Sequence, residues 1–305
     1  MSLNRVSTMD KDMPEADSVR IMVEYLYSVL IGNVITKWVF TDGKYADTIP
    51  SGFKEFQAAL PLRVEKVDCK GKFIYFVLKK EKKEIEEEGD EGEGSDEGSE
   101  EGGEEGDEEG GEEGGEEGGE GHEDVDKSSS HYILHSLMLS GNWVEEKGEF
   151  CKWFVELDNG RCLWFQDPRA LGTLKMTKDK LILTQKLEEL GPDILREEFT
   201  LPDFKNRTSK WKNRNITSFL LDQAVISGCG NHIKAEALYY AEISPQRKIG
   251  SLSDREVEQL YEGLKIVPRL MYNGEHTDKV YSNKMATKTK TADGRTTWWD
   301  PKVQK

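Results

Sequence analysis

Three residues near the start of the chain, Met13-Pro14-Glu15, offer the most reactive chemistry in the sequence. An N-terminal proline is a secondary amine with an α-amino pKa of about 8, so part of it is free base near neutral pH, whereas a lysine with a pKa of about 10.4 is almost fully protonated. Such an amine can attack an electrophilic carbon and form an iminium ion. The alternative is a plain helix start, because proline and acidic residues are common in the first turn.

Thirteen residues precede Pro14, so in the full chain its nitrogen is an amide that cannot attack. We expect either that translation starts at Met13 and the methionine is removed, or that the leader is trimmed. The remaining alternative is that the nucleophile is lost. Residues 1–12 are therefore predicted to be a leader that is absent or disordered in the mature protein.

A glycine-containing turn, Gly228-Cys229-Gly230-Asn231, follows Leu220-Leu221-Asp222-Gln223. Gly228 and Gly230 allow a tight turn whose backbone N–H groups could approach a phosphate. Asn231 would begin a helix whose N-terminus favours anions. The alternative is an ordinary turn between helices that uses glycine as a C-cap.

The charge of the chain is distributed unevenly. The net charge is −17, but residues 81–127 hold 25 of the 59 acidic residues and three lysines, which gives this segment −22 and leaves +5 for the rest. A segment of Glu, Gly, Asp and Ser cannot bury enough apolar surface to fold, so residues 84–126 are predicted to be a disordered insertion between strands. The folded part is mildly basic, which is compatible with a polyanionic partner.

Hydrophobic patterns predict an α+β protein. An amphipathic helix is expected first, then strands rich in β-branched and aromatic residues, then helices, and finally a basic hairpin that turns at Ala292-Asp293-Gly294. The expected helices are residues 17–31, 180–190, 217–225, 232–241 and 253–267, the strand regions are 64–78, 131–139 and 152–165, and the hairpin is 284–299.

The four cysteines are far apart and form no C-x-x-C pair, so neither a zinc finger nor a disulfide framework is predicted. They are expected to be buried thiols in a reducing compartment. No apolar run approaches the roughly 18 residues of a membrane span, and the first 12 residues lack a secretory signal. The expectation is an intracellular protein without a membrane partner.

Five short motifs occur in an order that resembles formamidopyrimidine-DNA glycosylases and endonuclease VIII, the Fpg/Nei family. The resemblance covers residues 13–305 apart from the acidic insertion. The motifs are Met13-Pro14-Glu15, Gly71-Lys72-Phe73, Asp167-Pro168-Arg169-Ala170-Leu171-Gly172, the Leu220–Asn231 stretch with its glycine turn, and Gly294-Arg295-Thr296-Thr297.

The resemblance implies an α+β fold. A catalytic domain at 13–177 would contain an N-terminal helix and a two-layer antiparallel β-sandwich. A helix-two-turn-helix domain would span 178–275, and a zinc-less finger hairpin 276–305, consistent with the lack of cysteines after Cys229.

The resemblance also implies roles for individual residues. Pro14 would be the nucleophile, Glu15 the proton-transferring carboxylate and Lys72 a charged contact to the opened sugar. Gly228, Gly230, Asn231 and Arg295 would bind DNA. Leu139, Arg169 and Leu171 would fill the space left by a flipped base, although core packing is an equal alternative for the two leucines. No metal and no organic cofactor are implied.

The function implied is excision of oxidised bases from damaged DNA, followed by cleavage of the abasic site, by a monomer located in the nucleus if the cell is eukaryotic. Two departures from the family pattern are Ser18, where a glutamate is frequent, and leucine at positions 139 and 171. One alternative is a DNA-binding relative without catalytic activity. Another is an acidic, chaperone-like protein whose Glu/Gly insertion binds basic proteins such as histones.

Overall fold

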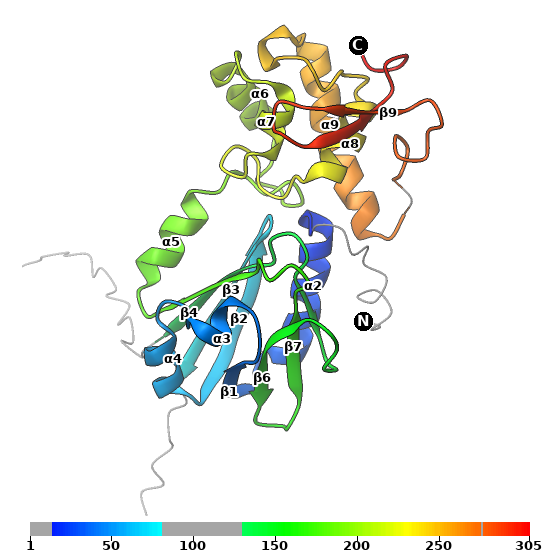
Figure 1. The fold of residues 1–305 in the computed structure, drawn as a ribbon. Coiled ribbons are helices and arrows are strands. Elements are labelled where there is room, and N and C mark those ends of the chain that lie inside the picture. Colours follow the sequence, from blue (N-terminus) through cyan, green and yellow to red (C-terminus); the bar gives the residue numbers. More distant parts are fainter. Residues whose placement is uncertain (1–13, 81–129, 276) are drawn as a thin grey trace, which may run out of the picture. The chain divides into compact units, whose positions relative to one another are not determined.

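The computed structural model describes residues 14–80, 130–275 and 277–305, which belong to one compact unit (Figure 1). The predicted leader, residues 1–12, and the acidic insertion, residues 84–126, lie outside the described residues. The first described helix is α2 (Ala16–Leu30), close to the predicted 17–31. Its apolar residues recur every three or four positions, so one face of the helix is buried in the core.

Eight strands follow α2 and form one antiparallel sheet in the order β5-β7-β6-β1-β2-β3-β4-β8. Short helices α3 (Lys44–Asp47) and α4 (Phe53–Ala59), which the sequence did not predict, connect β1 to β2. The strands are β1 (Val34–Phe40), β2 (Leu62–Lys70), β3 (Phe73–Lys80), β4 (His131–Ser136), β5 (Asn142–Val144), β6 (Cys151–Leu157), β7 (Cys162–Gln166) and β8 (Thr173–Thr177).

The sheet folds over, so that its two halves face each other across one core. β1 pairs with β2 through only the first two residues of each strand in the described register, which leaves room for a bend. The ring of His135 on β4 lies 4.9 Å from that of Phe165 on β7 and 5.9 Å from that of Trp153 on β6, although both strands are distant from β4 in the sheet order. The predicted α+β fold with an antiparallel β domain is confirmed, and its two layers are halves of one continuous sheet.

The second half of the described chain is helical, as predicted. It contains α5 (Lys180–Glu188), α6 (Leu201–Lys210), α7 (Ile216–Leu221), α8 (Asn231–Tyr240), the short 3-10 helix η1 (Ile249–Ser251) and α9 (Asp254–Tyr272). α7 ends before the predicted residue 225, because the chain turns from Asp222 onward. α9 continues through Pro268 beyond the predicted end at 267, since its apolar face is buried along the helical core.

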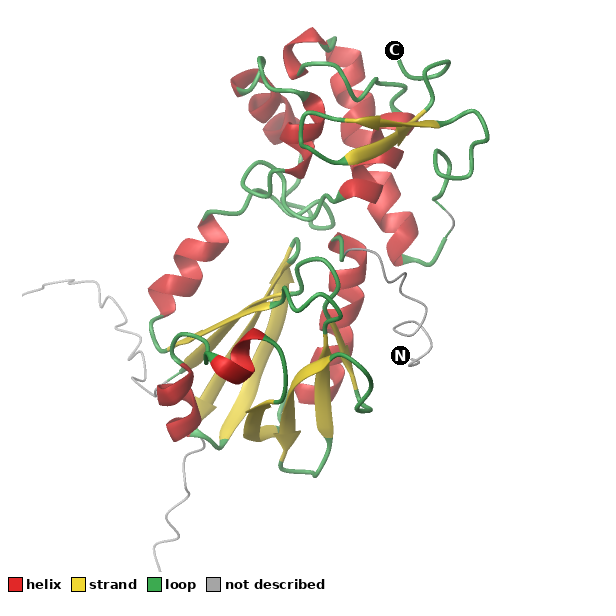
Figure 2. Ribbon diagram, in the orientation of Figure 1, coloured by secondary structure: helices red, strands yellow, loops and turns green. Residues whose placement is uncertain are grey.

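The chain closes on the predicted hairpin, with β9 (Thr287–Lys290) paired to β10 (Thr296–Trp299) and shown as two yellow arrows in Figure 2. Gly294 in the turn has φ +79°, a conformation that glycine adopts without steric cost. All four cysteines are free; Cys162 is partly buried and the other three are buried, which supports the prediction of buried thiols. Among the helices of the described residues, none is long and apolar enough to span a bilayer.

Candidate active site and nucleic-acid interface

Glu15 joins the start of α2 to the helical part of the chain. Its side chain is 3% exposed, and its two carboxylate oxygens accept hydrogen bonds from the backbone N–H groups of His232 at 2.8 Å and Ile233 at 2.9 Å. These amides belong to the first turn of α8, where the helix dipole favours a negative charge. Pro14 directly precedes Glu15 and is partly buried. The Pro14-Glu15 pair therefore lies at the N-terminus of α8.

This contact adds to what was expected of the glycine turn. The sequence predicted that backbone N–H groups of the turn could approach a phosphate and that the helix N-terminus would favour an anion, and the N–H groups of His232 and Ile233 in the first turn of α8 are bonded to Glu15. The N–H of Gly228 donates to Oε1 of Gln223 at 2.9 Å. The anion at this helix N-terminus is thus a side chain of the protein, and a DNA contact by the glycines themselves stays a prediction.

Three glycines let the backbone segments around Glu15 approach closely. A Cβ atom at Gly230 would lie 2.2 Å from Cδ of Glu15, and one at Gly71 would lie 2.5 Å from the nitrogen of Gly228. One at Gly228, where φ is +101°, would lie 2.7 Å from Cβ of Ala16. These distances are far below van der Waals contact, so a side chain at Gly230 would displace the side chain of Glu15, and one at Gly71 would displace the backbone at Gly228. The glycines bring the β2–β3 turn, the start of α2 and the turn before α8 together.

Lys72 follows Gly71 in the β2–β3 turn and is partly exposed. Burial lowers the pKa of Lys72, the carboxylates of Glu15 and Asp17 act to raise it, and the guanidinium of Arg295 acts to lower it further. A lysine with a lowered pKa exchanges protons more readily near neutral pH than an ordinary lysine does. The structure therefore brings three predicted residues, Glu15, Lys72 and Arg295, into one electrostatic cluster.

Asp17 is a second carboxyl group in this cluster that the sequence analysis did not select. Its side chain is 8% exposed, and its Oδ1 atom is buried with no hydrogen-bond partner among the described residues. Burial, together with the nearby charge of Glu15, raises the pKa of Asp17 to about 6. The available signal was a second acidic residue in the first turn of α2, which also fits an ordinary favourable interaction with the helix dipole.

Asp17→Asn is expected to stabilise the protein at pH 7.5 and to have little effect at pH 4. Because the pKa of Asp17 is higher in the folded protein than its ordinary value of 3.8, the folded state holds this proton more tightly. Stability from this group is complete below pH 4 and is lost as the pH rises toward 6. Removing the ionisable group should therefore raise the free energy of unfolding by about 3 kcal/mol at pH 7.5. Urea unfolding at both pH values measures the difference, and equal effects at the two values would contradict it.

Asn231 and Arg295 lie where α8 meets the hairpin. Nδ2 of Asn231 donates to the carbonyl oxygen of Thr296 on β10 at 3.1 Å, and its Oδ1 is buried with no hydrogen-bond partner in the described part of the chain. Arg295 is exposed at the end of the hairpin turn, where its backbone N–H donates to Oδ1 of Asp293 at 2.8 Å. Asn231 therefore fixes the hairpin to α8, and Arg295 presents a cation beside it.

The residues predicted to fill the space of a flipped base lie on two loops that Asp167 joins. The Asp167 carboxylate accepts from the hydroxyl of Ser140, next to Leu139, and from the backbone N–H of Gly172 at 2.7 Å. Leu139 is partly buried, Arg169 is exposed and Leu171 is 39% exposed. Neither leucine belongs to the buried core, so the core-packing alternative is not supported.

Backbone strain gathers at the same loops. Met138, Phe150 and Ala170 have φ values of 57°, 64° and 51°, which side chains other than glycine adopt at a cost. Phe150 is 50% exposed, and its carbonyl oxygen accepts from the N–H of Asp167 at 3.0 Å. Sequence analysis missed Phe150, because nothing local marks it. Strain and apolar exposure together are typical of a binding surface.

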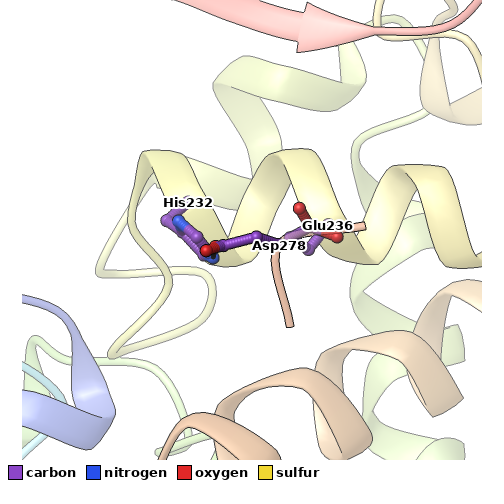
Figure 3. A group of neighbouring side chains, drawn as sticks. All are labelled: His232, Glu236 and Asp278. Carbon is purple, nitrogen blue, oxygen red and sulfur yellow. Dashed lines mark ion pairs between the residues drawn. The ribbon is translucent and has the colours of Figure 1, made fainter. Parts of the chain in front are cut away.

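A separate cluster of His232, Glu236 and Asp278 on and beside α8 has the residue types of a metal site (Figure 3). Nε2 of His232 lies 3.3 Å from Oδ1 of Asp278. The Glu236 carboxylate, however, accepts backbone N–H groups from Lys279 and Val280, each at 3.0 Å. These bonds hold the segment that leads toward the hairpin, which gives Glu236 a structural role.

Comparison with known proteins identifies the family. The model of the formamidopyrimidine-DNA glycosylase N-terminal domain matches residues 13–174, and that of the formamidopyrimidine-DNA glycosylase H2TH domain matches residues 190–276. The first match alone covers more than half of the chain. The protein belongs to the formamidopyrimidine-DNA glycosylase family, which includes proteins of the endonuclease VIII type.

Individual relatives match over part of their length. The formamidopyrimidine-DNA glycosylase of Herpetosiphon aurantiacus is 43% identical over 115 residues, which are 38% of this chain and 41% of the relative. That of Arabidopsis thaliana is 33% identical over 53% of this chain and 45% of the relative. Endonuclease 8 of an Enterobacter species is 35% identical over 32% of this chain and 38% of the relative. The chain thus spans less than half the length of these curated relatives.

Solved structures agree in fold. The MutM (Fpg) protein from Thermus thermophilus has a TM-score of 0.68 at 21% identity, covering 95% of this chain and 98% of that chain. The Lactococcus lactis protein bound non-covalently to DNA containing an AP site has a TM-score of 0.69 at 17% identity, covering 95% of this chain and 99% of that chain. These similarities show the fold shared by the chains.

Proposed function

We propose that this protein is a bifunctional DNA glycosylase and AP lyase that excises oxidised bases and nicks the abasic site, as in base excision repair. The observation that carries the proposal is the placement of Pro14-Glu15 at the N-terminus of α8, in one charged cluster with Lys72. Family membership supports it, and so does the AP-site DNA bound by the Lactococcus lactis structure of the same fold.

In the proposed reaction the free amine of Pro14 attacks C1′ of the damaged nucleotide. The bond from C1′ to the base breaks, the base leaves as its protonated form, and the proline nitrogen loses its proton. The C1′–O4′ bond then breaks, O4′ takes up a proton, and the nitrogen lone pair forms the second C1′–N bond of an iminium ion on the opened sugar. The iminium acidifies the hydrogens on C2′, and removal of one expels the 3′ phosphate by elimination. Two N–H groups occupy part of the Glu15 carboxylate, which leaves lone pairs free for protons at the sugar. Lys72 donates a proton or a charged hydrogen bond to the opened sugar.

DNA is the partner that the remaining residues fit. Arg295 can hold a phosphate with two parallel hydrogen bonds, next to the Asn231 contact that fixes the hairpin. The exposed Arg169 and Leu171, with Leu139 on the neighbouring loop, would enter the duplex where the damaged nucleotide is flipped out. Leucine lacks the flat face of an aromatic ring, so we propose apolar filling there rather than stacking.

A direct assay tests the function. A chain starting at Pro14 is incubated with duplexes that carry one oxidised pyrimidine, one oxidised purine or no damage. We expect release of the free oxidised base, detected by mass spectrometry, and a nicked strand without alkali, from at least one damaged duplex and not from the undamaged one. Tight binding without base release would instead identify a non-catalytic relative. Binding to histones but not to any duplex would favour the acidic interaction protein.

A further inference from the structure

One buried ion pair links α8 to the hairpin turn. The side chain of Lys234 on α8 is 0% exposed, and its Nζ lies 2.7 Å from Oδ2 of Asp293, whose side chain is 6% exposed. Lysine is among the residues least often fully buried. Burial lowers the pKa of Lys234, while the Asp293 carboxylate acts against that change. A desolvated pair of this kind contributes little net stability, so its presence calls for another role.

Asp293 uses its second oxygen to shape the turn. Oδ1 accepts from Oγ1 of Thr291 at 2.7 Å and from the backbone N–H of Arg295 at 2.8 Å. Burial alone would raise the pKa of Asp293, but the ammonium of Lys234 and the Thr291 hydroxyl hold it below its usual range. Gly294, between the two charged residues of the turn, has open space around it and offers no packing of its own. Backbone hydrogen bonds between Thr291 and Arg295 close the turn, and within it the Asp293 carboxylate is the side-chain acceptor that holds the N–H of Arg295.

From this geometry we propose that Lys234 and Asp293 are positioning residues that present Arg295 to the phosphate backbone of DNA. The ammonium of Lys234 fixes the Asp293 carboxylate, which fixes the backbone N–H of Arg295, and neither buried side chain touches the DNA. The same helix α8 holds Glu15 through its first-turn amides. The inference rests on the proposed function, since it assigns a partner to Arg295.

Loss of the pair should therefore act through Arg295. Without Lys234 the buried carboxylate of Asp293 would lack its cation. The carboxylate would then move toward water, and the backbone of the turn would shift with it. A residue that contacts a phosphate contributes about one unit to the dependence of log affinity on log salt. If Lys234 acts only by positioning Arg295, removing either residue should lower that slope by the same amount.

The test measures binding to a duplex with a non-cleavable abasic analogue from 50 to 300 mM salt. Arg295→Ala and Lys234→Met are each expected to weaken binding roughly tenfold at low salt and to lower the slope by about one. The double variant should bind like either single variant, because both changes remove one contact. The matched control is Lys37→Met, which breaks the exposed pair between Lys37 and Glu156 on the sheet and should leave affinity and slope unchanged.

A second variant separates positioning from stability. Lys234→Met combined with Asp293→Leu replaces the buried pair by apolar side chains and is expected to unfold at or above the temperature of the parent protein. This double variant should nevertheless bind DNA as weakly as Lys234→Met and show the same reduced salt dependence, because the N–H of Arg295 has lost its acceptor. Normal binding by this variant, or additive losses for Lys234→Met and Arg295→Ala, would overturn the inference. Unchanged binding by Arg295→Ala would also overturn it, while base release would still report independently on the proposed function.

Discussion

A chain that begins at Pro14 is expected to form a covalent adduct with abasic-site DNA when borohydride is added, and a chain that keeps residues 1–13 is expected to form none. The amide nitrogen of an internal proline has its lone pair delocalised into the carbonyl group. An N-terminal proline with a pKa of about 8 is roughly one-tenth free base at pH 7. We expect the trapped fractions to differ by at least about a hundredfold. Gel electrophoresis measures the adduct, and mass spectrometry of the cross-linked peptide locates it.

The control for this experiment is Lys72→Met in the chain that begins at Pro14. Lys72 is the competing amine, because its burial lowers its pKa and it shares a charged cluster with Glu15. If Pro14 is the nucleophile, the variant should still be trapped at the proline, although more slowly. An adduct on Lys72 in the unsubstituted chain that begins at Pro14, lost in Lys72→Met, would show that the lysine carries the covalent chemistry.

Local patterns predicted much of the fold. The periodic apolar face of α2, the glycines before α8 and the turn at Gly294 are short-range signals, and each produced an element close to its predicted place. α6 was not predicted because its sequence is mostly polar. It forms because Thr200 caps its first turn and Phe204 is buried in the helical core, and the second of these contacts depends on distant residues.

The site was predictable where a residue's chemistry is visible in a motif, and not where its role depends on a distant partner. Glu15 and Arg295 were selected from motifs. Glu15 accepts hydrogen bonds from amides of α8, and Lys234 pairs with Asp293. Each of these contacts joins residues more than 50 positions apart, so no local pattern reveals it. Asp17 looked like an ordinary first-turn acid until the structure showed it buried.

Glu15→Gln is expected to lower the single-turnover rate of base release by about a thousandfold while the protein stays folded. Glutamine can still accept one α8 amide through its Oε1 atom, but it cannot take up and return protons. Glu15→Ala leaves the N–H groups of His232 and Ile233 buried without an acceptor and should cost about 3 kcal/mol of unfolding free energy. Rates at saturating enzyme and urea unfolding measure the two effects separately.

Gly230→Ala tests whether base release needs Glu15 in its position on α8, and it leaves the Glu15 carboxylate present. Its new Cβ atom would lie 2.2 Å from Cδ of Glu15, so the carboxylate must leave its position on α8. If catalysis requires Glu15 in that position, the rate of base release should fall nearly as far as in Glu15→Gln. The matched control is Glu24→Gln on the same helix, which weakens a hydrogen bond from Tyr272 and should leave the rate within about twofold. A Gly230→Ala variant that folds and releases base at the parent rate would show that base release does not require Glu15 in its position on α8.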